Sequence, residues 1–142
     1  MKNIFILYIP PSNFEAKVHY QDTIVNKVSQ ERLFKYLDRT LQDHLRKIFF
    51  DKRITVWGSR SSDANRAKYE KMKVGDEILI VEGEEIKLLG KIAAKTINLV
   101  LSKKLWKNLK GDSSEGWDLI YFIANPQEVN IPFDKLNELF VR

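Results

Sequence analysis

Apolar residues fall into short runs separated by polar turns, a pattern that predicts several strands. Asn3 to Ile9 is rich in β-branched and aromatic residues and stops at Pro10-Pro11, which predicts a buried first strand. Four further strands are expected: Arg53 to Trp57, the run after the Gly-Asp turn in KVGDEILIV, Ile86 to Ala94, and WDLIYFI near the end. Gly90 interrupts the fourth of these five strands and predicts a bulge or bend there.

Helical spacing appears between these runs. Leu33, Leu37, Leu41, Leu45 and Phe49 recur every four residues, which predicts helical structure after a cap at Ser29. Thr40 with Asp43 is a candidate second cap, so one long helix and two shorter ones are both open. Ser61 or Ser62 is expected to cap a short helix that ends near Met72. Two more helices are expected in TINLVLSKKLWKNL and PFDKLNELF, whereas residues 14–28 fit either a short strand or irregular structure.

Strands with helices inserted between them predict an α+β domain with a curved sheet or small barrel. The 142 residues, 44% of them hydrophobic and 30% charged, suit one globular domain over 1–142. Without cysteine there are no disulfides and no thiolate metal sites. Too few apolar residues precede Pro10 for a signal peptide or membrane span, so we expect a cytoplasmic protein that does not enter membranes.

The formal net charge of +5 suggests a polyanionic partner if the cations share a face, and solvated helix faces if they do not. Two cationic groups stand out in the sequence: Arg60, Arg66, Lys68, Lys71 and Lys73, and then Lys103, Lys104, Lys107 and Lys110.

The sequence offers few combinations of residues that could form a catalytic site. The two histidines, His19 and His44, have no local partner spacing, so we expect both on the surface, with no catalytic residue, metal site or cofactor. The glycines are isolated and form no phosphate-binding loop. One alternative is a small metal-dependent nuclease, in which Asp76 and Glu85 would bind Mg²⁺ and Lys87 would orient water. Aspartate after glycine at a turn, and glutamates at a hairpin tip, are however ordinary structural features.

The tryptophans are the best binding candidates. Trp57 ends a strand before Gly58, which permits close backbone approach, and Ser59 and Arg60 place polar groups beside the ring. Trp117 opens a strand after the loop-forming KGDSSEG, and Trp106 lies near the end of an amphipathic helix; core packing is the alternative for both.

The order WG…GD…GK…LW…W.LIYF over Ile54 to Phe140, with the first strand, resembles the EVE-like N-terminal domains of McrB-type restriction proteins. These belong to the PUA-like superfamily with YTH, EVE and ASCH domains, and residues 14–50 would be a helical insertion. The resemblance implies a PUA-like curved β-barrel flanked by helices. It also implies that Trp57 is a wall of a cage for a methylated base, with Ser59 and Asn65 as edge readers and Arg60 at phosphate or base. Trp106 or Trp117 would supply the second wall.

We therefore expect a non-catalytic domain that reads a methylated base in DNA by base flipping, since a duplex hides its bases. Arg60, Arg66, Lys68, Lys103, Lys104 and Lys107 would contact the backbone, and a GTPase motor of the AAA+ class and a nuclease would lie outside this chain. The alternatives are an RNA-binding PUA or ASCH-like module and the nuclease described above.

Overall fold

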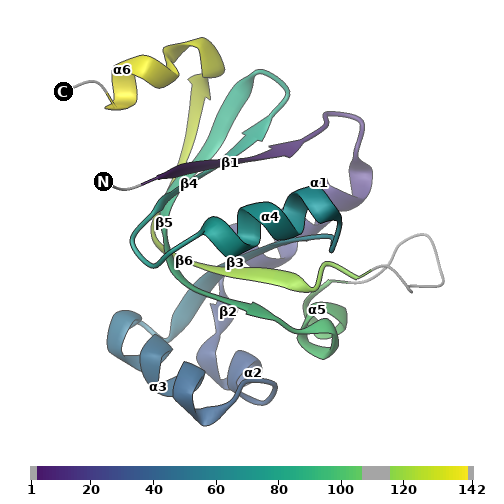
Figure 1. Cartoon of the computed structure of the whole chain (residues 1–142), viewed down its shortest axis with the longest axis vertical. Helices are drawn as coiled ribbons and strands as arrows, with labels where there is room; N and C mark the ends of the chain where they lie inside the picture. Colours follow the sequence, from purple (N-terminus) through teal and green to yellow (C-terminus); the bar gives the residue numbers. More distant parts are fainter. Residues whose placement is uncertain (1–2, 107–115, 141–142) are drawn as a thin grey trace.

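The computed structural model, which describes residues 3–106 and 116–140, is built on a curved sheet (Figure 1). Within these residues the sheet has six strands in the order β1-β4-β5-β6-β3-β2. Only β1 and β4 pair in parallel, and every other neighbouring pair is antiparallel. The mixed α+β class is thereby confirmed. The strands are β1 Ile4–Ile9, β2 Val28–Ser29, β3 Arg53–Ser59, β4 Glu77–Glu82, β5 Glu85–Ile97 and β6 Leu119–Pro132.

The curvature arises in the long strands β5 and β6. Their pairing shifts register three times, between Ile86 and Leu88, Leu89 and Lys91, and Ile92 and Ala94. Such bulges bend a strand and increase its twist. Gly90 lies at the second shift, where a Cβ atom would come within 2.3 Å of Ile123 Cγ2. The predicted bend at Gly90 is confirmed, and its reason is the close packing of β6 against β5.

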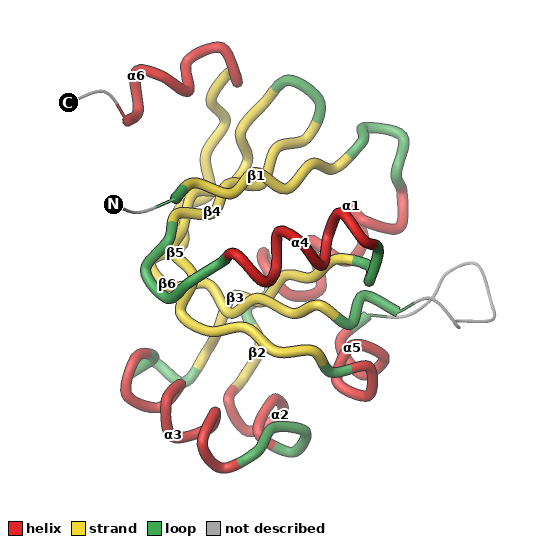
Figure 2. The backbone as a smooth tube through the Cα atoms, viewed as in Figure 1, coloured by secondary structure: helices red, strands yellow, loops and turns green. Residues whose placement is uncertain are grey.

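Helices surround the sheet on several sides (Figure 2). In the view of Figure 1, α2 and α3 lie below the sheet and α6 lies above it, whereas α4 crosses in front between β1 and β3. The helical segments are α1 Phe14–Tyr20, the π-helical turn η1 Gln21–Val25, α2 Gln30–Phe34, α3 Arg39–Ile48, α4 Asp63–Lys71, α5 Leu99–Leu105, the 3₁₀ turn η2 Phe133–Lys135 and α6 Leu136–Phe140.

Side-chain caps fix where the helices begin. The Ser29 hydroxyl accepts from Arg32 N at 3.2 Å and the Ser62 hydroxyl accepts from Asn65 N at 3.1 Å, so both predicted caps are confirmed. The leucine-rich pattern forms two helices, α2 and α3. The second is capped by Asp38, which accepts from Leu41 N at 2.8 Å, and not by Thr40.

Residues 14–25, for which a strand or irregular structure was expected, are helical. Their buried residues are Ala16, His19, Thr23 and Ile24. Two of these four are polar, which weakens the apolar periodicity that identifies an amphipathic helix. The Thr23 hydroxyl bonds to Val56 and Trp106, which are distant in the sequence, so the pattern of residues 14–25 does not reveal these partners.

Two main apolar clusters share β3. Ile54 and Val56 belong to the cluster that also includes residues of α2, α3 and α5, and Trp57 belongs to the one that includes Leu7, Ile9 and Met72. None of the helices in residues 3–106 and 116–140 combines the length and apolar character needed to cross a membrane.

Gly58 in β3 lies in close contact with Trp106, the residue that caps the C-terminal end of α5. A Cβ atom at Gly58 would lie 2.8 Å from Cη2 and 2.9 Å from Cζ3 of Trp106. The Trp106 indole N–H donates to Thr23 Oγ1 at 3.2 Å, and the Thr23 hydroxyl donates to the Val56 carbonyl oxygen at 2.5 Å. Glycine at 58 is thus required by packing, because the indole occupies the space of a side chain.

Replacing Gly58 with alanine is expected to destabilise the protein by about 1–3 kcal/mol, the usual cost of overpacking a core. The new methyl group would displace the Trp106 ring and break its bond to Thr23. Chemical denaturation of the Gly58→Ala variant measures the loss. In a Trp106→Leu background the same substitution should cost less, because the clashing ring atoms are gone. Equal losses in both backgrounds would contradict this account.

Candidate functional site

A cavity of about 870 Å³ opens where β1 and β3 end, beside the beginnings of α1 and α4. Six of the residues expected to bind nucleic acid line it together: Trp57, Ser59, Arg60, Asn65, Lys68 and Trp117. Its apolar lining includes Leu7, Ile9 and Ala16. Residues far apart in the sequence therefore meet at one concave surface, of the size that small-molecule sites usually have.

The aromatic part of the cavity is a packed group of rings. The Trp117 ring meets Trp57 edge to face, with centroids 5.0 Å apart and planes at 80°. Tyr20 contacts Trp57 in the same manner at 5.9 Å. Trp57 is only 3% exposed, whereas Trp117 is half-buried. Trp57 lines the cavity as its buried floor, and Trp117 has the more accessible ring for stacking.

Trp106 does not line the cavity, which corrects its expected placement as a base contact. It is 4% exposed and packs against Gly58 and the other two tryptophans, with centroid distances of 6.5 Å to Trp57 and 5.6 Å to Trp117. Its ring supports the tryptophans that line the cavity. The core-packing alternative for Trp106 agrees with this position.

Two expected edge-reading residues lie at the cavity with part of their hydrogen-bonding capacity already used. Ser59 Oγ lies 2.8 Å from the Tyr121 hydroxyl. Burial raises the pKa of Tyr121 to about 12, so this hydroxyl keeps its proton at neutral pH. Asn65 Nδ2 donates to the Arg60 carbonyl oxygen at 2.9 Å, which leaves the Asn65 Oδ1 acceptor and one N–H for a ligand.

Glu15 is a cavity residue that the sequence reasoning missed. Its carboxylate is 10% exposed and lies 3.4 Å from Arg60 Nη2. Lys68 lies on the opposite helix, where its ammonium group donates to the Ile6 carbonyl oxygen at 3.1 Å. The cavity therefore combines an acceptor carboxylate with two cations. The available signal was Pro10-Pro11 followed by Asn13, which caps α1 by accepting from Ala16 N at 3.0 Å.

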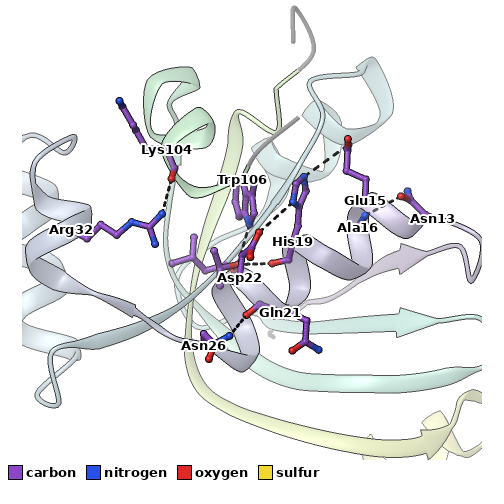
Figure 3. Close-up of polar contacts among 12 residues, drawn as sticks. Asn13, Glu15, Ala16, His19, Gln21, Asp22, Asn26, Arg32, Lys104 and Trp106 are labelled. Atoms are coloured by element: carbon purple, nitrogen blue, oxygen red, sulfur yellow. Dashed lines mark hydrogen bonds and ion pairs between the residues drawn. The ribbon is translucent and has the colours of Figure 1, made fainter. Parts of the chain in front are cut away.

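His19 lies behind the tryptophans and is 3% exposed, which corrects the expectation of a surface position. Its ring packs edge to face on Trp117 with centroids 4.6 Å apart. Figure 3 shows the imidazole between two carboxylates, with Nε2 3.9 Å from Glu15 and Nδ1 3.8 Å from Asp22. Burial lowers the pKa of His19, an effect that both carboxylates oppose and Arg60 reinforces. His44 is also not fully exposed, since its Nε2 lies 2.8 Å from the Ala93 carbonyl oxygen.

The remaining expected backbone contacts lie outside the cavity lining. Arg66 is exposed on α4, and its Nε donates to Ser61 Oγ at 2.5 Å. Lys103 and Lys104 are exposed in the last turn of α5. Lys107 and Lys110, together with most of the KGDSSEG loop, lie outside the described residues.

The arrangement expected for a metal-dependent nuclease is not present. Asp76 precedes β4, whereas Glu85 begins β5 opposite Glu82 at the other end of the β4–β5 hairpin. The six residues of β4 separate the two carboxylates by about 20 Å, too far to share a magnesium ion. Asp76 instead accepts from Asn3 N and Lys73 N. The described part of the chain contains no cluster of three or more metal-ligating His, Cys, Asp or Glu residues.

Comparisons with protein-family models, with curated proteins and with solved structures gave no match to this chain.

Trp57 and Trp117 should differ in their importance for stability. Because Trp57 is almost fully buried, Trp57→Ala is expected to cost about 3–5 kcal/mol of unfolding free energy. Trp117→Ala should cost clearly less, because its ring is only half-buried. Urea denaturation of both variants tests the difference. Wild-type stability in the Trp57→Ala variant would show that this ring is not part of the core.

His19 should make stability depend on pH. The unfolded chain binds a proton at His19 near the ordinary pKa of 6.5, whereas the folded protein does so only at lower pH. The unfolding free energy should therefore decrease as the pH falls below about 6.5, by at most about 1.4 kcal/mol per pH unit from this group. His19→Gln should remove this part of the slope, and His44→Gln is the matched control. An unchanged slope in His19→Gln would contradict the assignment.

Proposed function

We propose that this chain is a recognition domain that binds DNA and holds one extruded, methylated base in the cavity at the ends of β1 and β3. The observation that supports the proposal most directly is the shared cavity. It places Trp57 and Trp117 beside Ser59 and Asn65, with Arg60 and Lys68 also in its lining. Aromatic rings, hydrogen-bonding groups and cations are the three components that recognition of a flipped base requires.

The energetic requirement can be met by these groups. Extrusion of a base costs a few kcal/mol, which stacking and hydrogen bonds to the base edge must offset. Stacking on one aromatic ring contributes about 1–3 kcal/mol. We assign this contact to Trp117, since Trp57 exposes only 3% of its surface and serves as the floor. Asn65 and Glu15 also line the cavity, and on this proposal they bond to the polar edge of the base.

Discrimination of a methylated base would come from the apolar wall. Leu7, Ile9 and Ala16 line the same cavity and are buried hydrophobic residues. A methyl group placed against them would remove apolar surface from water, which contributes about 0.8 kcal/mol per carbon and more where it fills a space. The cations at the cavity would attract phosphate regardless of sequence.

The fold proposed for this function is PUA-like. The curved sheet ends at β1 on one side and at β2 beside β3 on the other, and α4 lies between β1 and β3 (Figure 1). On this proposal the chain is a non-catalytic sensor in the cytoplasm for a McrB-type restriction system. The GTPase motor of the AAA+ class and the nuclease would be separate domains or subunits.

The test is a binding screen at one fixed salt concentration. Fluorescence anisotropy would compare DNA oligonucleotides that carry one methylated cytosine or adenine with unmodified DNA and with RNA. We expect one methylated DNA to bind most tightly, and Trp117→Ala to weaken that complex by about 5- to 150-fold, the equivalent of one stacking contact. Val74→Ala, which shortens an exposed apolar side chain outside the cavity lining, is the control.

Two results would contradict the proposal. Equal affinity for methylated and unmodified DNA would show that the domain does not recognise a modified base. Wild-type affinity in Trp117→Ala would show that the base does not bind in this cavity. A consistent preference for RNA would instead support the alternative of an RNA-binding PUA or ASCH-like module.

A further inference from the structure

A second cavity, of about 480 Å³, lies at the opposite end of β3 from the first. Its lining comes from the turn between α3 and β3 and from residues 123–126 of β6, with Lys27 added from the segment before β2. Among the lining residues, Phe50 carries an aromatic ring, Arg53 a positive charge and Thr55 a hydroxyl group. None of them belongs to the site proposed above.

Phe50 is the most exposed large hydrophobic residue in the described part of the chain, at 86%. The turn that presents it is held at two points by Gln30. The Gln30 side chain donates to the Phe49 carbonyl oxygen at 2.8 Å, and the Gln30 backbone N–H donates to the Lys52 carbonyl oxygen at 2.9 Å. The exposed ring is therefore presented by an anchored turn, so little conformational entropy would be lost when it stacks on a ligand.

Positive charge surrounds this ring. Lys27 and Arg53 line the cavity, and Lys52 is exposed in the same turn. Arg53 Nη1 donates to the Lys27 carbonyl oxygen at 3.4 Å, which holds the guanidinium beside Lys27. No ion pair involves any of these three cations among the described residues. The one carboxylate in the turn, Asp51, accepts from Arg53 N at 3.3 Å and leaves an excess of two positive charges.

The cavity also contains an unused polar group. Thr55 is 1% exposed, and its hydroxyl has no hydrogen-bond partner in the described part of the chain. Buried hydroxyl groups in proteins usually have partners, because an unpaired one loses its bonds to water without replacement. Among the residues described, Thr55 Oγ1 and His19 Nδ1 are the buried side-chain atoms in this condition.

From these observations we infer that the second cavity is a subsite for a flanking nucleotide of the same DNA. Phe50 stacks on a base or sugar of that nucleotide, and Lys27 and Arg53 contact its phosphates. This inference rests on the function proposed for the first cavity. Arg53 and Ser59 stand at the two ends of β3 and line one cavity each, and they lie about 20 Å apart, which corresponds to about six base steps of duplex at about 3.4 Å each.

The experiment measures affinity against DNA length and salt. Two duplexes would carry the methylated base at their centre, one of about 8 base pairs and one of about 20, because only the longer one reaches about 20 Å on either side. On the long duplex, Phe50→Ala should weaken binding by about 5- to 150-fold. Lys27→Ala combined with Arg53→Ala should reduce the slope of log K against log salt by about 1.8. Neither the Phe50 substitution nor the double substitution should change the affinity for the short duplex.

Each of these variants has a matched control variant. Val74→Ala removes exposed apolar surface elsewhere, and the Lys35→Ala, Lys135→Ala pair removes two exposed cations that do not line the cavity. All variants should melt within a few degrees of wild type, since Phe50, Lys27 and Arg53 are exposed. Wild-type affinity of Phe50→Ala for the long duplex, together with an unchanged salt slope in the Lys27→Ala, Arg53→Ala variant, would overturn the subsite alone as long as the wild-type protein binds both duplexes. Absence of DNA binding by the wild-type protein at either length would overturn the function of the first cavity as well.

Discussion

The close packing of Trp106 against Gly58 is the constraint on which the candidate site depends. An indole ring occupies the position that a side chain at residue 58 would need, at 2.8 Å from the ideal Cβ position. Its N–H reaches Thr23, and the Thr23 hydroxyl in turn donates to the carbonyl oxygen of Val56. This chain of contacts ties α5 and the π-helical turn η1 to the last residues of β3. Those residues are the ones that enter the first cavity.

The cavity is consequently an assembly of segments held by apolar packing and by buried hydrogen bonds. α1 contributes Glu15 to its wall and places His19 against Trp117. His19, with two carboxylates within 4 Å, keeps a lowered pKa because it is removed from water. Its ring packs edge to face on Trp117 and supports this half-buried indole. The wall and its support thus share one short helix, which lies in the segment expected to be an insertion.

β3 contributes residues to both of the cavities that we propose bind nucleic acid. Its last residues supply Trp57, Gly58 and Ser59 to the first cavity, and its first residues supply Arg53 and Thr55 to the second. β3 is hydrogen-bonded to β2 at Arg53 and Ile54 and to β6 from Thr55 to Ser59, so it holds the two sites at a fixed separation. Rigid spacing of this kind allows two weak contacts on one DNA molecule to act together, because the second contact forms without a new loss of translational freedom.

The sequence by itself determined β1, β3, β4, β5 and the first part of β6, because runs of β-branched and aromatic residues between turn signals have few other stable arrangements. It did not reveal the two-residue strand β2 or the continuation of β6 to Pro132. It also determined the Ser29 and Ser62 caps and the bend at Gly90, which depend on local hydrogen bonds and on backbone freedom. It identified Trp57, Ser59, Asn65 and Trp117 by local spacing and by resemblance, and these four line one cavity.

Only the tertiary structure decided which tryptophan is accessible, since exposure depends on contacts with residues distant in the sequence. Trp106 and Trp57 are covered by each other and by Thr23, Tyr20 and Trp117, and no local pattern records those neighbours. Glu15 and His19 were missed for the same reason. Their helix buries His19 against the rings of Trp106 and Trp117, which are distant in the sequence, so its sequence lacks the apolar periodicity that would have predicted it.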